Sequence, residues 1–309
     1  MQLSLFDLHC DTAYEMHRTN QSLKQNDLMI SLENARKFKQ YVQVMALWTD
    51  HSLTDEDGWQ ACLAMYQRLR MDPVIQDGDA LLCTKPSAND ALVPQILLGV
   101  EDLRILNGIE NRLDTLWEMG VRWITPLWKG ESCIGGSHDT SMGLTEFGKT
   151  AVKNACNRGM IVDISHASER SSEDILSIAK ACDVPIVATH SNAYALCPVT
   201  RNLRSWQINA IVEQNGVIGL NLYPDFICSD REASIDDLIP HIEYFLSYGL
   251  EDRLCLGCDM DGATMPKEIQ NLAALPVLAE RLQRLNYTDT LIDKLFFANA
   301  FRFASQYLK

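Results

Sequence analysis

Eight short apolar runs, spread along the chain, constrain the fold more than any other feature of this sequence. They cover residues 3–9, 41–48, 95–101, 122–127, 160–166, 185–190, 217–223 and 254–261. Amphipathic helical patterns lie between several of them, at residues 111–120, 145–159, 171–182, 205–216 and 235–249. Strands that alternate with helices form βα units and a parallel sheet, and eight such strands close a barrel. We therefore predict a (β/α)8 TIM barrel, with residues 1–309 forming a single domain.

The alternative is a doubly wound open sheet. No Gly-x-Gly-x-x-Gly motif follows the first apolar run to support it.

Two segments have little regular pattern, residues 84–94 and 129–142. The second is rich in Gly and Ser, and we expect it to form a loop over the mouth of the barrel.

Charge and termini exclude some classes of partner. The chain has 27 Lys and Arg against 41 Asp and Glu, a net charge of −14, which repels nucleic acid and anionic membrane surfaces. The first residues carry no basic segment, Asp7 interrupts their apolar run, and no apolar stretch reaches the ~20 residues of a membrane span. We therefore expect a cytoplasmic protein that binds neither nucleic acid nor membranes.

The ten cysteines do not suggest a disulfide framework in a chain of this length. Cys62, Cys156 and Cys182 lie in helical patterns and are expected to be small core residues. Cys255 and Cys258 form a Cys-x-x-Cys pair, but in a strand these positions face opposite sides. We therefore expect no redox or zinc-knuckle role for this pair.

Polar residues stand at the carboxyl ends of the predicted strands, where catalytic groups of a barrel lie. They are His9, Asp11, Glu101, His166, His190, Asp259 and Asp261. Each follows a mostly apolar run, where a buried charge or imidazole is costly unless it is paired or bound to a metal. A single one could be a core histidine or a solvated carboxylate, but three histidines and at least three carboxylates at one end favour metal binding.

The ligand types suit zinc or a similar first-row divalent ion. Residues i and i+2 of a strand face the same side, so His9 and Asp11 are expected to project together, with Cys10 pointing away. The set is too large for one tetrahedral site, whereas two metals that share a bridging carboxylate would use it. We expect His17, His51 and His241 to be surface or packing residues and His138 to lie in the loop over the mouth.

Several longer stretches resemble the membrane dipeptidase (renal dipeptidase) family of amidohydrolase-type barrels. They are "DLHCDT", "GLTEFGKTAVKNACNRGMIVDISHAS", "PIVATHSNAYALCPVTRNL" and "LGCDMDG", between about residues 5 and 262. The resemblance supports the barrel and implies a zinc-dependent dipeptidase that acts through a metal-bridging hydroxide on substrates with a free C-terminal carboxylate, sometimes that of a D-residue. It also implies that two copies can pair as a homodimer.

The resemblance assigns roles to individual residues. His9 and Asp11 would bind the first Zn²⁺, His166 and His190 the second, and Glu101 would bridge the two. Asp259 would be the catalytic acid and base, and Arg201 would bind the terminal carboxylate of the substrate, for which its planar fork is suited. Tyr223, at the end of the seventh predicted strand, is added to the expected substrate-binding residues.

Two positions depart from the family pattern. Trp128 stands where the family usually has a histidine that contacts the substrate, and indole cannot carry a positive charge. We hypothesise that His138 folds back to take over this contact. Cys258 stands where the family has a glycine beside the catalytic aspartate, a change that could crowd the strand end.

Two other functions stay open. Trp128 could indicate a metal-dependent hydrolase of another amide or of a lactone. A catalytically silent metal-binding barrel is a further alternative, although Glu101 and Asp259 have no evident use in a silent site.

Overall fold

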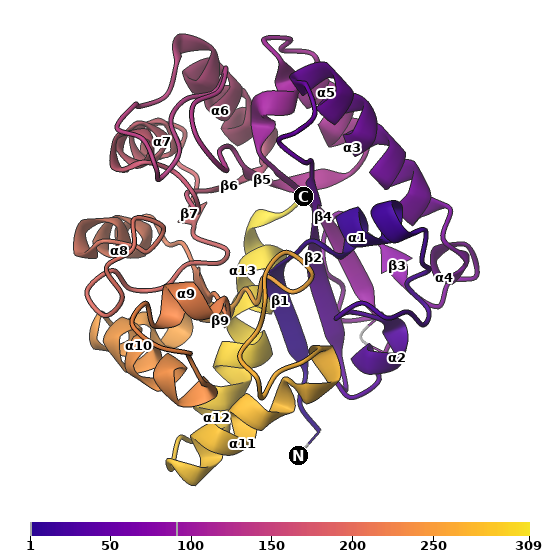
Figure 1. The fold of residues 1–309 in the computed structure, drawn as a ribbon, viewed down its shortest axis with the longest axis vertical. Coiled ribbons are helices and arrows are strands. Elements are labelled where there is room, and N and C mark those ends of the chain that lie inside the picture. Colours follow the sequence, from indigo (N-terminus) through magenta and orange to yellow (C-terminus); the bar gives the residue numbers. More distant parts are fainter. Residues whose placement is uncertain (1, 91) are drawn as a thin grey trace.

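A computed structural model describes residues 2–90 and 92–309 and contains the predicted barrel (Figure 1). All eight predicted strands are present, and a two-residue strand, β3, pairs with β4 beside them. The strands are β1 (Leu5–Cys10), β2 (Tyr41–Trp48), β3 (Leu81–Leu82), β4 (Gln95–Glu101), β5 (Val121–Thr125), β6 (Ile161–Asp163), β7 (Ile186–Val187), β8 (Ile218–Leu220) and β9 (Leu254–Leu256).

All of the strand pairs are parallel, in the order β7-β6-β5-β4-β2-β1-β9-β8. A further parallel bridge joins Ala188 to Ile218, where the Ala188 N–H donates to the Val217 carbonyl oxygen at 3.1 Å. This bridge brings the two ends of the sheet together and closes the barrel. The doubly wound alternative is therefore wrong.

Helices surround the strands (Figure 1), and the five predicted helical patterns correspond to α5, α6, α7, α8 and α10. The helices are α1 (Thr12–Thr19), α2 (Leu32–Ala35), α3 (Asp55–Arg70), α4 (Pro73–Gln76), α5 (Arg112–Glu118), α6 (Glu146–Arg158), α7 (Glu169–Ala181), α8 (Ser205–Glu213), α9 (Pro224–Ile227), α10 (Ile235–Ser247), α11 (Pro276–Arg284), α12 (Asp289–Asp293) and α13 (Asn299–Tyr307). Short helical turns lie at η1 (Leu103–Leu106), η2 (Leu250–Asp252), η3 (Leu272–Ala274) and η4 (Lys294–Ala298).

Local sequence explains several of the helix boundaries. The Thr145 hydroxyl accepts the Gly148 N–H at 2.9 Å at the start of α6, and Ser168 accepts the Ser171 N–H at 2.9 Å at the start of α7. Such N-caps satisfy backbone donors that a helix leaves free. Gly159 ends α6 in the left-handed region, with φ 83°, which glycine adopts without steric cost.

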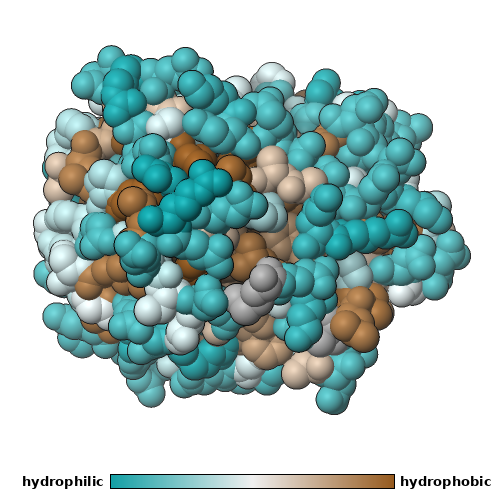
Figure 2. Space-filling model, turned by 90° about the horizontal axis from the view of Figure 1, so that it is seen from below, coloured by the Kyte–Doolittle hydropathy of each residue, from teal (hydrophilic) through white to brown (hydrophobic). Residues whose placement is uncertain are grey.

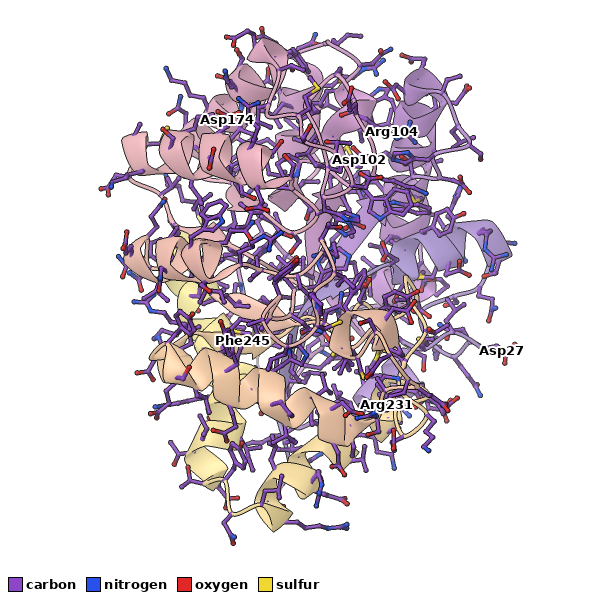
Figure 3. The ribbon with its side chains drawn as sticks, turned by 60° about the vertical axis from the view of Figure 1, so that its left-hand side comes forward. Asp27, Asp102, Arg104, Asp174, Arg231 and Phe245 are labelled. Carbon is purple, nitrogen blue, oxygen red and sulfur yellow. The ribbon has the colours of Figure 1, made fainter. Side chains whose placement is uncertain are left out.

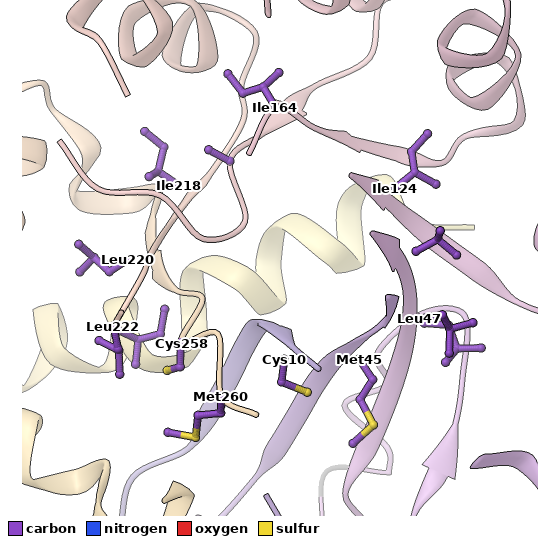
Figure 4. Packing of buried hydrophobic residues seen from close by; sticks show 14 of the residues in the cluster. Cys10, Met45, Leu47, Ile124, Ile164, Ile218, Leu220, Leu222, Cys258 and Met260 are labelled. Atoms are coloured by element: carbon purple, nitrogen blue, oxygen red, sulfur yellow. The ribbon is translucent and has the colours of Figure 1, made fainter. Parts of the chain in front are cut away.

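The interior of the barrel is apolar toward the amino ends of the strands. This interior cluster contains Phe6, Leu8, Val42, Val44, Leu97, Trp123, Ile161, Val187, Val217 and Cys255. Phe303 of α13 packs against Trp123, with ring centroids 6.0 Å apart, so the last helix covers this end of the barrel. A second, outer cluster packs the other strand faces against the helices and includes Cys10, Cys258 and Met260 (Figure 4).

The same interior strand faces become polar toward the carboxyl ends. Glu101 lies four residues after Leu97, Thr125 two after Trp123 and Asp163 two after Ile161, so each shares the inward face of its strand. The alternation of side chains along the strands thus produces an apolar lower layer and a polar upper layer, and the upper layer holds the candidate site.

Charged and polar residues cover most of the face seen in Figure 2, with separate apolar patches among them, as the acidic composition leads one to expect. Within residues 2–90 and 92–309, no helix is both long enough and apolar enough to cross a bilayer. The segment 129–142 forms the predicted loop, which is held by isolated bridges such as that between Ser137 and Ala167.

Candidate metal centre

The five expected metal ligands meet at the carboxyl ends of the strands. His9 Nε2 lies 3.6 Å from Asp11 Oδ2 and 3.6 Å from Glu101 Oε2. The pairing of β1 with β2 shifts its register between Asp7 and Cys10, an irregularity that can re-aim side chains. His9 and Asp11 therefore project together into the site while Cys10 joins the outer cluster, as predicted.

His166 and His190 approach the other oxygen of the same carboxylate. His166 Nε2 is 3.0 Å and His190 Nε2 is 3.3 Å from Glu101 Oε1, and the two nitrogens are 3.0 Å apart. The Glu101 carboxylate thus stands between two groups of side chains, with one oxygen toward each.

The hydrogen bonds of the Nδ1 atoms of His166 and His190 determine whether their Nε2 atoms carry a proton or a lone pair. His166 Nδ1 lies 3.1 Å from the Trp128 carbonyl oxygen, which can only accept, so this nitrogen carries the proton. His190 Nδ1 lies 2.7 Å from Thr189 Oγ1, whose hydroxyl also contacts the buried Asp163 carboxylate. If the hydroxyl donates to Asp163, it must accept from His190 Nδ1. Both Nε2 atoms then present lone pairs to each other and to Glu101.

A cluster of acceptors that face one another without a donor calls for a cation between them. In the described part of the chain, His9 Nε2, Asp11 Oδ1 and Glu101 Oε1 are buried and have no hydrogen-bond partner. Native proteins seldom leave buried polar atoms unpaired. Among the described residues, two groups bring their ligand atoms within 4.8 Å of one another, His9 with Glu101 and His190, and His9 with Asp11 and Asp259. The donor set therefore fits one or more divalent ions.

Electrostatics give the same result. Burial lowers the pKa of His166, with Arg201 adding to the shift, and burial together with His9 holds the pKa of His190 well below its usual value. Burial would raise the pKa of Glu101, but His9 and His166 reverse this and hold it well below the ordinary range. Neutral His166 and His190 beside an ionised Glu101 are in the protonation states that metal binding requires.

On the β1 side of the site, burial lowers the pKa of His9, but the charges of Glu101 and Asp11 outweigh it and raise the pKa well above the usual value. Burial also raises the pKa of Asp11 to about 7. The carboxylates therefore require positive charge at this point, which a proton on His9 or a bound cation can supply.

Asp259 stands at the edge of this cluster. Its Oδ1 is 3.9 Å from His9 Nε2, and its Oδ2 accepts a hydrogen bond of 3.0 Å from Asn221 Nδ2. The backbone of Asp259 is left-handed, with φ 65°, as is that of His166, with φ 67°. Such angles are uncommon outside glycine and concentrate at functional sites. Asp261 lies apart, accepting the Thr12 hydroxyl at 2.6 Å and the Met29 N–H at 2.7 Å.

Arg201 is buried next to the ligands. Its Nη1 donates to Ser191 Oγ at 2.8 Å and its Nη2 to the His190 carbonyl oxygen at 3.0 Å, while Nε has no partner in the described residues. Burial lowers the pKa of this guanidinium, and the charge of Asp259 opposes the shift. Two hydrogen bonds leave further donors of the fork free.

The remaining expected residues lie around the mouth. The His138 ring centroid is 5.8 Å from that of His166, and its Nδ1 lies 3.0 Å from Thr200 Oγ1, so the loop does return to the site. Burial lowers the pKa of His138 to about 4, with smaller contributions from the neighbouring His166 and Arg201. The Tyr223 hydroxyl donates to Asp225 Oδ2 at 2.8 Å. The Trp128 ring centroid lies 6.3 Å from that of His166.

Sequence reasoning missed the residues that hold the ligands. Buried Asp163 accepts hydrogen bonds from the Thr125 hydroxyl at 2.8 Å and from the Ser165 N–H at 2.8 Å, and it contacts Thr189. Asp7 accepts the backbone N–H groups of His9 and Cys258 at 2.9 and 3.2 Å. The Cys258 side chain packs in the outer cluster. The sequence did contain one indication of these two residues. Asp7 and Asp163 are carboxylates inside apolar runs, where a buried charge needs hydrogen-bond partners.

One further neighbour of the site, His51, was missed. His51 Nε2 lies 2.6 Å from Asp102 Oδ2, and the His51 ring centroid is 4.7 Å from that of Trp128, so this histidine borders the site rather than lying apart from it. His241 is the packing residue that was expected, with Nδ1 accepting the Ala193 N–H at 3.1 Å. No sequence pattern distinguished the two.

Comparison with known proteins identifies the family of this chain. The family model described as membrane dipeptidase (peptidase family M19) matches residues 1–307. The uncharacterized protein in the pqqA 5′ region of Klebsiella pneumoniae is 36% identical over 208 residues, which is 63% of this chain and 76% of that relative. An uncharacterized dipeptidase of Schizosaccharomyces pombe is 33% identical over 220 residues, 67% of this chain and 51% of that relative, so the match spans about half its length.

Solved structures agree in fold. A metallo peptidase from Rhodobacter sphaeroides, liganded with a phosphinate mimic of the dipeptide L-Ala-D-Ala, superposes with a TM-score of 0.89 at 24% identity, covering 99% of this chain and 100% of that one. A dipeptidase described as a metallo peptidase of family M19 gives a TM-score of 0.90 at 24% identity, covering 99% of both chains. The match of the family model over almost every residue decides the assignment: this chain is a metallopeptidase of the membrane dipeptidase family.

Proposed function

We propose that this protein is a zinc dipeptidase that cleaves dipeptides with a free C-terminal carboxylate, including those with a C-terminal D-residue. The observation that carries the proposal is the position of Glu101, with Oε2 3.6 Å from His9 Nε2 and Oε1 3.0 and 3.3 Å from the Nε2 atoms of His166 and His190. One carboxylate between two ligand groups suits a pair of ions that it bridges. His9 and Asp11 would hold one Zn²⁺, and His166 and His190 the other.

Two such ions, when bound, would lower the pKa of a coordinated water toward ~7 and polarise the scissile carbonyl. Asp259 would accept the proton of the attacking water and pass it to the leaving amine nitrogen. The hydrogen bond from Asn221 Nδ2 to Asp259 Oδ2, at 3.0 Å, keeps this carboxylate oriented and leaves Oδ1 toward His9.

Arg201 would bind the terminal carboxylate of the substrate. Its two hydrogen bonds to Ser191 Oγ and the His190 carbonyl oxygen fix the guanidinium beside the ligands, which reduces the entropy lost on binding. The mimic of L-Ala-D-Ala bound by the Rhodobacter sphaeroides metallo peptidase supports a small dipeptide as substrate, with a D-residue at its C-terminal position.

The contact that the family histidine makes to the substrate would fall to His138. Its ring stands 5.8 Å from that of His166, and its low pKa, about 4, keeps it neutral, so it would act as a hydrogen-bonding group without charge. Tyr223 and Trp128 would line the same space. We further propose that residues 1–309 act as a single domain and that two copies pair, which light scattering would reveal as a doubled mass.

The test joins metal content with hydrolysis. We expect about two zinc ions per chain and turnover of dipeptides that carry L- or D-residues at the C-terminal position. Asp259→Asn should lower kcat by about 10²–10⁴-fold while zinc content is retained. Asp27→Asn is the matched control, because Asp27 lies at the outer edge of the molecule (Figure 3) and should leave kcat unchanged.

Trp128 motivates a second candidate function. Full zinc content without dipeptide turnover, together with turnover of other amides or of lactones, would replace the dipeptidase by the alternative hydrolase. Zinc without any turnover would indicate the catalytically silent barrel.

A further inference from the structure

We propose that Tyr14, Trp48, His51 and Trp128, here called the aromatic wall, bind the side chain of the N-terminal residue of the substrate and make large apolar residues preferred there. The inference rests on the proposed dipeptidase function and adds a substrate class to it. The four side chains come from α1, the end of β2, the segment after β2 and the segment after β5.

Trp48 places the wall inside the mouth of the barrel. Its Cα pairs with that of Glu101 in the β2–β4 register, and paired residues of neighbouring strands point to the same face. Val44, four residues earlier in β2, belongs to the interior cluster, so Trp48 shares that inward face. The large indole of Trp48 therefore stands beside the Glu101 carboxylate of β4. On the next two strands, β5 and β6, the corresponding layer holds the polar residues Thr125 and Asp163.

The four rings pack against one another in a row. The centroids of Trp48 and Tyr14 are 4.8 Å apart, those of Trp48 and Trp128 are 5.0 Å apart, and those of His51 and Trp128 are 4.7 Å apart. Trp128 connects this surface to the ligand His166 through a centroid distance of 6.3 Å and through its carbonyl oxygen, which accepts from His166 Nδ1. The wall thus begins at a metal ligand and leads away from it.

The wall is held in place before any substrate binds. His51 Nε2 lies 2.6 Å from Oδ2 of the buried Asp102, the residue after Glu101. Buried Arg104, beside Asp102 in Figure 3, donates to the Asp50 carbonyl oxygen at 2.8 Å and to the Thr49 carbonyl oxygen at 3.3 Å. These bonds fix the segment after β2 against the end of β4, so the rings lose little freedom when they bind an apolar group.

The closed barrel places β2 opposite the element that carries Arg201. In the order β7-β6-β5-β4-β2-β1-β9-β8, closed between β7 and β8, four steps lead from β7 to β2 in either direction. Arg201 follows β7, and Trp48 ends β2. A dipeptide whose carboxylate lies at Arg201 and whose scissile bond lies at Glu101 therefore extends its N-terminal residue toward the aromatic wall.

The experiment compares kcat/KM for Gly-Ala, Ala-Ala, Leu-Ala and Phe-Ala. We expect Leu-Ala and Phe-Ala to exceed Gly-Ala by at least about tenfold, the discrimination that an apolar subsite provides. Trp48→Ala and Trp128→Ala should each reduce this ratio to within about threefold, and Trp48→Phe should retain most of it. Trp206→Ala is the control, because Trp206 belongs to α8 and not to the aromatic wall, and its indole N–H donates to Oε2 of the exposed Glu169 at 3.3 Å.

The outcomes separate this inference from the proposed function. Turnover of all four dipeptides at similar kcat/KM by the unaltered protein would overturn the aromatic wall and leave the dipeptidase standing. A preference that survives both Trp48→Ala and Trp128→Ala would also overturn it. No turnover of any dipeptide would overturn both. The profile of the unaltered protein needs no variant, so a variant that fails to fold does not remove the test.

Discussion

Thr189 determines which nitrogen of His190 can bind a metal ion. Its hydroxyl lies between His190 Nδ1, at 2.7 Å, and the buried Asp163 carboxylate. The hydroxyl donates to Asp163 and therefore accepts from Nδ1, which leaves Nε2 free toward Glu101. A single hydroxyl thus transmits the orientation of a buried carboxylate to a ligand.

Thr189→Val should therefore weaken binding of the second zinc ion by about 10–100-fold, the usual effect of losing a partner behind a ligand. Thr189→Ser, which keeps the hydroxyl, should restore most of the affinity. Competition with a chromophoric chelator measures both. Thr150→Val is the control, because the Thr150 hydroxyl bonds to the Glu146 carbonyl oxygen on an exposed face of α6. Unchanged zinc affinity in Thr189→Val would disprove the relay.

Arg201 gives a second prediction at the scale of one residue. Lysine keeps the charge but not the planar fork, and it cannot reproduce the paired bonds to Ser191 Oγ and the His190 carbonyl oxygen. Arg201→Lys should raise KM for free dipeptides by about tenfold or more, while hydrolysis of C-terminally amidated dipeptides changes less. Steady-state kinetics on the two substrate series measure the difference. Equal effects on the free and the amidated dipeptides would show that Arg201 does not bind the terminal carboxylate.

At the scale of the elements, close approach of backbones shapes the β7–β9 side of the barrel. A Cβ atom added at Gly257 would lie 1.7 Å from the Thr189 carbonyl oxygen, and one added at Gly219 would lie 1.9 Å from the same atom. Both positions face backbone, which cannot move aside as a flexible side chain can. Glycine here lets the strands meet directly below His190 and Asp259.

Gly257→Ala should consequently lower the free energy of unfolding by about 1–3 kcal/mol or more, as overpacking does. Gly99→Ala is the matched control in β4, where the added Cβ would meet Val44 Cγ1 at an ordinary 3.4 Å. Chemical denaturation of the two variants provides the comparison. Equal stability of Gly257→Ala and the unaltered protein would mean that β7 and β9 are not packed this closely.

The sequence determined the elements more completely than the contacts between them. Apolar runs revealed the eight strands, and the position of His9, Glu101, His166 and His190 after those runs predicted that they would meet. Sequence reasoning missed Thr189, Asp163 and Asn221, because their roles depend on contacts with side chains of other strands. The apolar pattern along one segment contains no information about such contacts. The pairing of His51 with Asp102 spans 51 residues and is equally invisible in a linear pattern.

At the scale of the whole molecule, we expect metal binding and folding to be coupled. The acceptors His9 Nε2, Asp11 Oδ1 and Glu101 Oε1 are buried without partners in the described residues, and they come from β1, the following turn and β4. An ion that binds them links separate βα units and favours the folded state by mass action.

Removal of zinc by a chelator should therefore lower Tm by at least about 5 °C, and added zinc should restore it. Differential scanning calorimetry on the chelated and reloaded protein measures the shift. His190→Ala, which removes one ligand, should show a smaller response to the chelator. A Tm that does not depend on zinc would contradict the coupling.

The position of the ions tests the central claim most directly. Anomalous scattering at the zinc edge, from crystals of the protein grown with zinc, locates each ion without reference to activity. The account predicts two peaks on either side of the Glu101 carboxylate, one in contact with His9 and Asp11 and the other in contact with His166 and His190. No peak beside Glu101, or a single ion bound elsewhere, would contradict it.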